Sequence, residues 1–279
     1  PADRARVRSA IEWRLDAVFH KGRSWAAGGL MDPLGMGGKM GSHPYQNTLW
    51  CVPGLLAIAG ESRIADAILP MVVKWITGVS ASQGPEEAYN EGHGYGTEKG
   101  GTYLDAVVWL HLLAPGLDLG RNPQLAGLGD WYAHLFPVGV ERLSWGDQWT
   151  PMLHLKQEQM LRAWQLAWIT GAPRFAARAR AFEQWRFHGG WKSQHTQTWL
   201  PLIAFNRLNL PQPDPAGETA SRLFPNAGWI FAGNRQPSDW RAIPDSIQLQ
   251  MQARPMGRGS HSYRSDGAFI WHAFGKTLS

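Results

Sequence analysis

The sequence predicts a mainly helical α+β protein in which a long helical region is followed by an antiparallel β-sheet. Up to about residue 210, apolar residues recur every three or four positions, which is the period of one face of an α-helix. After the Pro-rich stretch LPQPDPAGET, apolar and polar residues alternate, which is the period of a β-strand. We therefore expect a helical domain over 1–210, a linker over 211–220 and a sheet domain over 221–279.

Stretches rich in glycine and proline, such as LAPG, ITGAP and FHGG, divide the helical region into separate helices. In the first of them Leu15, Val18 and Phe19 fall on one apolar face. His111 lies on the apolar stripe of a later helix and His272 lies in a strand, so both are expected to be satisfied core residues. The expected helices, which fit an antiparallel array, cover 5–20, 45–59, 62–77, 98–113, 123–135, 152–170, 173–187 and 196–206.

The sheet region contains predicted strands in GWIFAGNR, SIQLQMQAR and GAFIWHAFG. In the second of these, Ile247, Leu249 and Met251 alternate with glutamines, which is typical of a half-buried strand. The sequence begins without methionine and stops just after a strand. Because a small sheet with open edges is an awkward end for a chain, we expect it to be part of a longer protein.

Composition and charge limit the class of partner. Hydrophobic residues make up 44% of the chain, which excludes a disordered protein, and no apolar run approaches the roughly 20 residues of a membrane-spanning helix. The net charge of +5 favours an anionic partner. The basic residues are scattered rather than gathered into a nucleic-acid-binding arm. The densest basic stretch, RFAARARAFEQWR, is expected to be a solvated helix face.

Tryptophan and cysteine usage add to this picture. The 16 tryptophans offer flat apolar faces that suit stacking on sugar rings, although core packing is the simpler explanation for most of them. Together with the positive charge they point to an acidic glycan as partner. The single cysteine, Cys51, excludes an internal disulfide framework and is expected to be a small buried residue.

Three glycine-rich segments combine an open backbone with titratable side chains, as loops that display catalytic groups do. They are GMGGKMGSHPYQNTLW with His43, Gln46 and Asn47, YNEGHGYGTEKGGTY with Glu91, His93 and Tyr95, and MGRGSHSYRSDGAF with His261, Tyr263 and Arg264. Taken singly, each also fits a cap, a turn or ordinary packing. The second segment has too much glycine for a core helix, since each glycine costs about 1 kcal/mol relative to alanine. We therefore expect an open loop around His93 and Tyr95, ahead of the helix expected over 98–113.

Taken together, these segments resemble the heparinase II/III-like polysaccharide lyases, including the oligoalginate-lyase branch. SHPYQNTLWCVPGLLAIAGESRIADAIL is similar to the family segment in which a catalytic histidine precedes a helix, and NEGHGYG to its Glu-Gly-x-x-Tyr segment. RLSWGDQW, which contains Trp145, is similar to the Gly-Asp motif that follows. LFPNAGWIFAGNR and GRGSHSYRSDGAFIWHAFGKTL are similar to the opening of the family's sheet module. The resemblance implies an incomplete (α/α) toroid packed on an antiparallel β-sandwich, truncated here, with the active site in the cleft between them.

The resemblance also implies roles for individual residues. His43 matches the family's first histidine, Tyr95 its catalytic tyrosine and His261 the first histidine of its sheet motif. We expect these three to be catalytic and to line one cleft. The residues expected to contact substrate are Gln46, Asn47, Glu91, His93, Trp145, Tyr263 and Arg264.

The chain departs from the family pattern in the sheet motif. Tyr263 stands where the family has a second histidine, and Ser265 where it has an aspartate. These positions help to hold a structural divalent metal, zinc-like in character, in some members. Asp266 is shifted by one position and could substitute, but we do not predict a metal or another cofactor from this sequence. Ser42 replaces the asparagine that often precedes the first histidine.

The implied reaction is β-elimination in a polysaccharide that contains uronic acid, which makes the chain a carbon–oxygen lyase. The enzyme must remove the weakly acidic proton on C5 and protonate the leaving oxygen on C4, while preorganised donors stabilise the enolate-like charge. The proton-transferring groups must lie within about 3 Å of the sugar. A tyrosine whose pKa is lowered by nearby histidines or Arg264 could serve as base and acid, alone or with His43.

Two other functions fit the same outline. A glycoside hydrolase would need two carboxyl groups about 5 Å or about 6.5–9.5 Å apart, and Glu86, Glu87, Glu91 and Asp147 are available. A non-catalytic protein that binds acidic glycans would keep the tryptophans and the basic balance. We expect an acidic polysaccharide or oligosaccharide as partner, no nucleic acid, no membrane span, and a periplasmic or secreted location.

Overall fold

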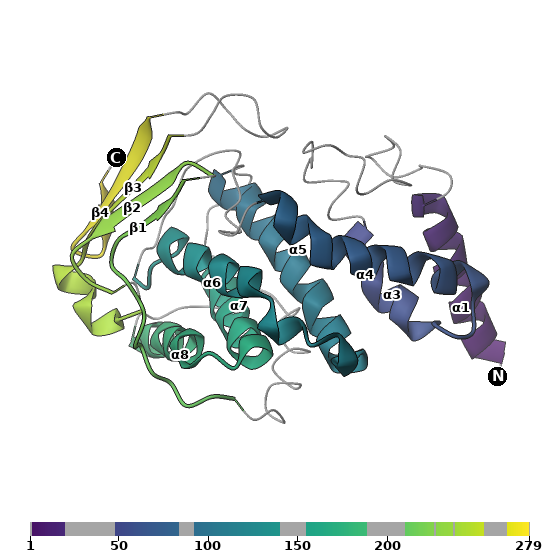
Figure 1. Cartoon of the computed structure of the whole chain (residues 1–279). Helices are drawn as coiled ribbons and strands as arrows, with labels where there is room; N and C mark the ends of the chain where they lie inside the picture. Colours follow the sequence, from purple (N-terminus) through teal and green to yellow (C-terminus); the bar gives the residue numbers. More distant parts are fainter. Residues whose placement is uncertain are drawn as a thin grey trace.

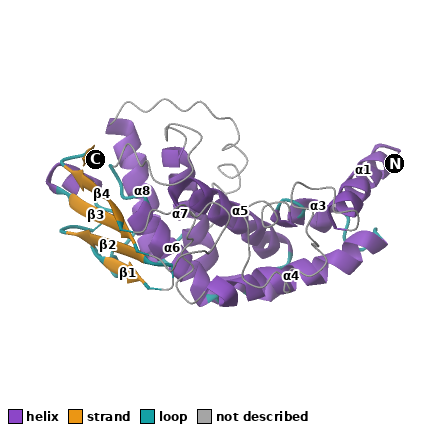
Figure 2. Cartoon of the chain, turned by 90° about the horizontal axis from the view of Figure 1, so that it is seen from above, coloured by secondary structure: helices purple, strands orange, loops and turns teal. Residues whose placement is uncertain are grey.

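Helices and strands occupy opposite ends of the molecule (Figure 1). The computed structural model describes residues 2–19, 48–83, 92–139, 155–188, 210–225, 227–236, 238–253 and 267–278. Its α-helices are α1 (Ala2–Phe19), α3 (Val52–Ala57), α4 (Arg63–Gln83), α5 (Gly92–Leu113), α6 (Pro123–Leu135), α7 (Leu155–Thr170) and α8 (Pro173–His188). In two views α1 lies farthest from the sheet, and α6, α7 and α8 lie nearest to it (Figures 1 and 2).

The predicted change from helices to strands is confirmed for the described residues. The last described α-helix ends at His188 and the first strand begins at Arg222. The helices follow the predicted apolar stripes, since Leu15, Val18 and Phe19 of α1 are all buried. The helix expected over 196–206 lies outside the described residues.

One predicted helix is shorter than expected. The sequence predicts a helix over 45–59, whereas α3 covers only Val52–Ala57 and follows a separate helical turn at 48–49. Pro53 stands at the second position of α3. Proline has no N–H to donate to the preceding turn, and it is tolerated only at the start of a helix. A continuous helix through residue 53 is therefore disfavoured.

Two of the helices near the sheet, α7 and α8, form a hairpin that the sequence predicts closely. α7 ends at Thr170 and α8 begins at Pro173. Gly171 adopts a positive φ of 66°, the left-handed conformation with which helices commonly end at glycine. Pro173 then takes the first position of α8, where a missing N–H is harmless. The stretch ITGAP therefore sets both ends of this turn.

The sheet is a five-stranded antiparallel meander in the order β1-β2-β3-β4-β5. Its strands are β1 (Arg222–Phe224), β2 (Trp229–Gly233), β3 (Ile247–Gln252), β4 (Ala268–Ala273) and β5 (Lys276–Leu278). A 3₁₀-helix, η4 (Trp240–Asp245), connects β2 to β3. Phe274 and Gly275 form the turn between β4 and β5 with φ of 56° and 72°. Such two-residue turns match the twist of a β-hairpin.

The inner face of the sheet packs on the helices and carries both aromatic and polar residues. Trp229 and Phe231 of β2 are at most 1% exposed. Gln248, Gln250 and Gln252 of β3 are also buried, at 5%, 0% and 1% exposure. The alternating strand predicted at 247–252 is thus present, with its glutamines facing inward and its aliphatic residues facing outward.

The inward glutamines have a specific partner in the last turn of α6. Gln250 donates from Nε2 to the backbone oxygens of His134 (3.0 Å) and Leu135 (3.2 Å), and Gln248 donates to His134 O over 3.4 Å. The last carbonyl groups of a helix have no partner within the helix. The polar face of β3 therefore caps α6 and joins the sheet to the helices.

Candidate functional site

The predicted catalytic tyrosine lies in the first turn of a helix. α5 begins at Gly92, so the backbones of His93 and Tyr95 are helical. The expected open loop is therefore wrong for residues 92–97, and the helix predicted over 98–113 begins six residues earlier than expected. The structure describes the backbone of His93 and Tyr95 and not their side chains, so the roles predicted for them remain predictions.

Two of the glycines in this segment are needed where α5 meets its neighbours. A β-carbon on Gly100 would overlap the hydroxyl of Tyr132 in α6. A β-carbon on Gly101 would lie 2.7 Å from Nη2 of Arg162 in α7. The cost of glycine in a helix is thus accepted because two side chains pack directly against the backbone of α5. This close approach is the physical reason why glycine stands at these two positions of α5.

An ion pair holds the same part of α5 to α7. The side chain of Arg162 is only 8% exposed and binds both carboxylate oxygens of Asp105, one of them over 3.2 Å. Gln165 adds a bond from Nε2 to Oδ1 of Asp105 over 2.9 Å and accepts one from Arg162 over the same distance. A two-pronged Arg–carboxylate contact fixes orientation as well as distance. The helix that carries Tyr95 is therefore anchored about three turns beyond that residue.

The remaining predicted site residues lie outside the described part of the chain. This applies to His43, Gln46, Asn47, Glu91, Trp145, His261, Tyr263 and Arg264. It also applies to Ser42, Ser265 and Asp266 of the sequence comparison and to the carboxylates considered for a hydrolase, Glu86, Glu87 and Asp147. The convergence of His43, Tyr95 and His261 on one cleft stays a prediction.

Of the two histidines expected to be structural, His272 lies in a strand as predicted, and His111 is less buried than expected. His272 is 4% exposed, and its Nδ1 lies 3.1 Å from the hydroxyl oxygen of Thr277 on the neighbouring strand. His111 is only half-buried and lies edge-on to Trp168, with ring centroids 4.9 Å apart. Its Nδ1 makes no hydrogen bond within the described residues, so a fully satisfied core position is wrong. Partial burial lowers the pKa of His111 and favours the neutral ring.

A buried polar cluster that sequence reasoning missed lies between the helices and the sheet. Asp130 of α6 binds Arg174 of α8 and Arg222 of β1, each at 3.2 Å. Arg178 of α8 is 3% exposed and donates from Nη2 to the backbone oxygens of Tyr132 (3.2 Å) and Phe136. The stretch RFAARARAFEQWR is therefore not simply a solvated helix face, because Arg178 is buried.

His134 is the titratable group at the centre of this cluster. Its Nδ1 lies 2.7 Å from the backbone oxygen of Asp130, and its ring centroid is 5.5 Å from that of Phe231 in the sheet. Burial lowers the pKa of His134 to about 4, which keeps the ring neutral near pH 7. A neutral ring is expected here because burial disfavours the charged form, and the neighbouring Arg178 disfavours it further.

The cluster also contains a buried acid, Glu218 of the linker. Burial raises the pKa of Glu218 and lowers the pKa of Arg178 to about 10, while each attracts the other. The hydroxyl of Ser238 interacts with the Glu218 carboxylate. The signal for the cluster in the sequence is a polar pair at i and i+4 on each of two helices, Asp130 with His134 and Arg174 with Arg178.

What this cluster can do chemically follows from its burial. His134 and Arg178 bind backbone oxygens, and Asp130 is held between two arginines. Groups fixed in this way join α6, α8 and β1 and specify how the sheet sits on the helices. We therefore assign the cluster a positioning role and keep the predicted catalytic residues distinct from it.

In the described part of the chain, no group of three or more His, Cys, Asp or Glu side chains is placed to hold a metal ion. None of the described helices is long and apolar enough to cross a membrane. Burial raises the pKa of Cys51 to about 11, which agrees with the expected buried thiol.

The search for relatives adds no further constraint on this site. Models of known protein families do not match the chain, and no curated protein matches it. The resemblance to heparinase II/III-like lyases therefore rests on the motifs themselves.

Proposed function

We propose that this chain is the helical toroid and the first part of the β-sandwich module of a polysaccharide lyase, which cleaves a uronic-acid-containing polymer by β-elimination. The supporting observation is the setting of Tyr95 in the first turn of α5. Later turns of the same helix are anchored by the Gly100–Tyr132 contact and by the Arg162–Asp105 ion pair. A catalytic group needs such a rigid support, because it must be held in place to within a fraction of an ångström.

The order of elements supports the proposal at the level of architecture. A run of helices is followed by an antiparallel sheet, and the sheet packs over the end of α6. This is the order that the resemblance implies. On this proposal, Tyr95 and His43 share the removal of the C5 proton and the protonation of the C4 oxygen. Gln46, Asn47 or an arginine contacts the uronate carboxylate, and His261 is the third catalytic residue.

The decisive experiment compares two tyrosines of one helix. Tyr95→Phe removes only a hydroxyl, and we expect elimination to slow by about 10²–10⁴-fold because a proton-transfer group is lost. The matched control is Tyr103→Phe, since Tyr103 is buried and its hydroxyl donates to the backbone oxygen of Ile76 over 3.4 Å. The control should lose on the order of 1 kcal/mol of stability and keep its activity.

The readout is the ultraviolet absorbance of the unsaturated uronate that only elimination produces, measured on alginate, heparan, chondroitin, hyaluronan and ulvan together with melting temperature. Release of reducing ends without this absorbance would instead indicate a hydrolase. Tight binding without any cleavage would indicate a glycan-binding protein. Normal turnover by Tyr95→Phe would show that its hydroxyl is not the acid or base.

A further inference from the structure

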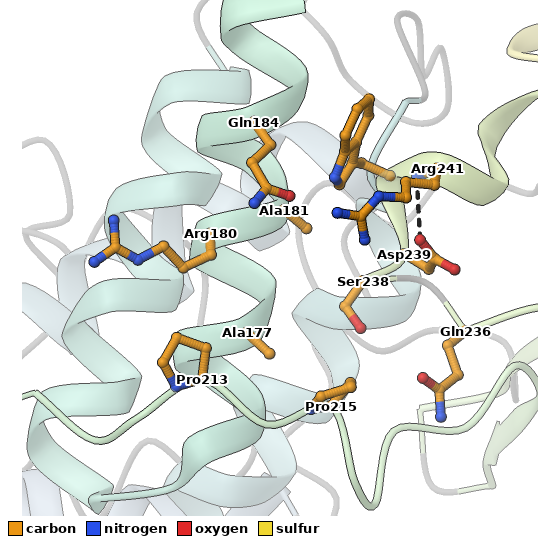
Figure 3. A pocket seen from close by; sticks show the side chains of 11 residues that line it. Ala177, Arg180, Ala181, Gln184, Pro213, Pro215, Gln236, Ser238, Asp239 and Arg241 are labelled. Carbon is orange, nitrogen blue, oxygen red and sulfur yellow. Dashed lines mark hydrogen bonds between the residues drawn. The ribbon is translucent and has the colours of Figure 1, made fainter.

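A cavity of about 310 Å³ lies where α8, the linker and the segment before β3 meet (Figure 3). This volume falls at the lower end of the range for small-molecule sites, about 300–1,000 Å³. The apolar part of its lining comes from Ala177, Ala181, Pro213 and Pro215. These small side chains give a smooth surface against which the C–H face of a sugar ring can pack.

One buried hydroxyl in the lining is only loosely engaged. Ser238 is 6% exposed, and its Oγ makes no hydrogen bond of normal geometry within the described residues, although it interacts with the Glu218 carboxylate and lowers the pKa of that group. Buried hydroxyl groups in proteins almost always have a partner. Gln236 next to it donates from Nε2 to the backbone oxygen of Glu218 over 3.0 Å, which leaves its amide oxygen turned toward the cavity (Figure 3). Ser238 and Gln236 thus offer a donor and an acceptor to a polar ligand.

The charge that faces the cavity comes from Arg241. Figure 3 shows its guanidinium turned into the same space as the amide of Gln184. Arg241 is exposed, and its Cζ lies 5.4 Å from the ring centroid of Trp240, which also lines the cavity. The Asp239 carboxylate accepts a hydrogen bond from the backbone N–H of Arg241 over 3.0 Å. This bond caps the start of η4, the helix that carries Arg241.

The lining contains two other charged side chains, Arg180 and Asp239, so its net charge with Arg241 is +1. The guanidinium of Arg180 points away from the cavity in Figure 3. It binds Oε2 of Glu183 over 2.9 Å and lies 5.2 Å from the Trp164 ring centroid. Among the charged side chains of the lining, Arg241 is therefore the cation that is turned toward the cavity.

We propose that this cavity binds one saccharide unit that carries a single carboxylate. Arg241 binds the carboxylate, Ser238, Gln236 and Gln184 bind ring hydroxyls, and the alanines and prolines contact the apolar face of the ring. The inference rests on the proposed function in one respect only, the choice of an acidic glycan as ligand. The cavity is a binding subsite, and Tyr95, His43 and His261 have no part in it.

The test measures the binding of sodium glucuronate and of glucose, its neutral counterpart, by calorimetry or saturation-transfer NMR up to tens of millimolar. Glucuronate should bind more tightly than glucose. Arg241→Gln should weaken glucuronate binding by about 10- to 100-fold, because a charge-assisted hydrogen bond is lost, and should leave glucose binding unchanged. Ser238→Ala should weaken the binding of both sugars. The matched control is Arg235→Gln, since Arg235 is exposed on the same segment, pairs with Asp245 at 3.8 Å and does not line the cavity.

Three outcomes would overturn the inference: no saturable binding of glucuronate by the wild-type chain, equal binding of the two sugars, or equal effects of Arg241→Gln and Arg235→Gln. All variants are first checked for an unchanged melting temperature, which is expected because both arginines are exposed. Failure of the lyase proposal is recognised separately. A chain without elimination activity that still binds glucuronate through Arg241 supports the subsite alone, and Tyr95→Phe should leave this binding intact.

Discussion

The two faces of the sheet are built in opposite ways. The inner face carries the buried glutamines of β3 beside Trp229 and Phe231. The outer face carries large apolar side chains that are well exposed, including Phe269 at 60% and Trp271 at 42%. The alternation of apolar and polar residues in the sequence correctly separates the two faces of β3. It does not reveal which face is buried, because that depends on what lies against each face.

The partner of each face explains the difference. The inner face lies over the last turn of α6, where carbonyl groups need donors, and amide side chains supply them. On the outer face, strand pairing aligns Leu223, Ile230, Met251 and Phe269 in one apolar row across four strands. A second row places Leu249 beside Trp271 and Trp271 beside Leu278. Contiguous exposed apolar surface of this kind usually marks a face that other groups contact.

The largest effect should come from deleting a matched aromatic residue on each face. Phe231→Ala empties a fully buried position and should lower the free energy of unfolding by about 3–5 kcal/mol. Phe269→Ala should change it by less than about 1 kcal/mol, because its ring is mostly exposed. Urea unfolding followed by circular dichroism measures both. Similar losses for the two variants would mean that the outer face is covered in solution.

A second effect is the pH dependence that His134 gives to the free energy of unfolding. Its pKa is about 4 in the folded chain against an ordinary 6.5, so between these values the unfolded chain takes up a proton that the folded chain does not. Stability from this group is therefore complete above pH 6.5 and falls as the pH drops to 4, by about 3 kcal/mol in all.

Glu218 gives stability the opposite pH dependence. The effect of His134 must therefore be measured against a variant that lacks only this histidine. Its raised pKa means that the folded chain keeps a proton that the unfolded chain loses above pH 4.5, so its contribution falls as the pH rises. The difference in stability between wild type and His134→Gln isolates the histidine. That difference should shrink as the pH is lowered from 6.5 to 4. A difference that stays constant over this range would contradict a neutral, buried His134.

The smallest effect should come from exchanging polarity on adjacent positions of β3. Gln250→Leu leaves Leu135 O without this donor and His134 O with only the longer bond from Gln248, and should cost about 1–3 kcal/mol. Leu249→Gln on the outer face should stay within about 0.5 kcal/mol, since that side chain is only half-buried. Urea midpoints measure both changes. If Leu249→Gln proved the more harmful, the orientation of β3 would be wrong.

Much of the fold could be predicted because its signals are local. The turn between α7 and α8 follows from Gly171 and Pro173, and the change of period after the Pro-rich linker marks where strands begin. The helical state of 92–97 was not predicted, because glycine is unfavourable in a helix and the glycines of this stretch locally favour a loop. The contacts of Gly100 and Gly101 with Tyr132 and Arg162 form only in the folded chain and leave no local signal.

The candidate site divides in the same way. The catalytic and substrate-binding residues were predicted from short motifs. Of these residues, the structure describes only the backbone of His93 and Tyr95, which is helical. The residues around the cavity come from α8, the linker and the segment before β3, and no local pattern links them. The burial of Arg178 was missed for a related reason, because its acceptors are backbone oxygens of another helix.

The capping of α6 by side chains from other elements has a consequence for cooperativity. Its terminal carbonyl groups take their hydrogen bonds from Gln250 in the sheet and from Arg178 in α8. Neither the sheet nor α8 can detach without leaving buried carbonyl acceptors of α6 unpaired. Partial unfolding of either element therefore costs hydrogen bonds at the end of α6. The last helical turn of α6 therefore couples the strand-rich and helix-rich parts of the chain into one folding unit, although the two are separate in the sequence.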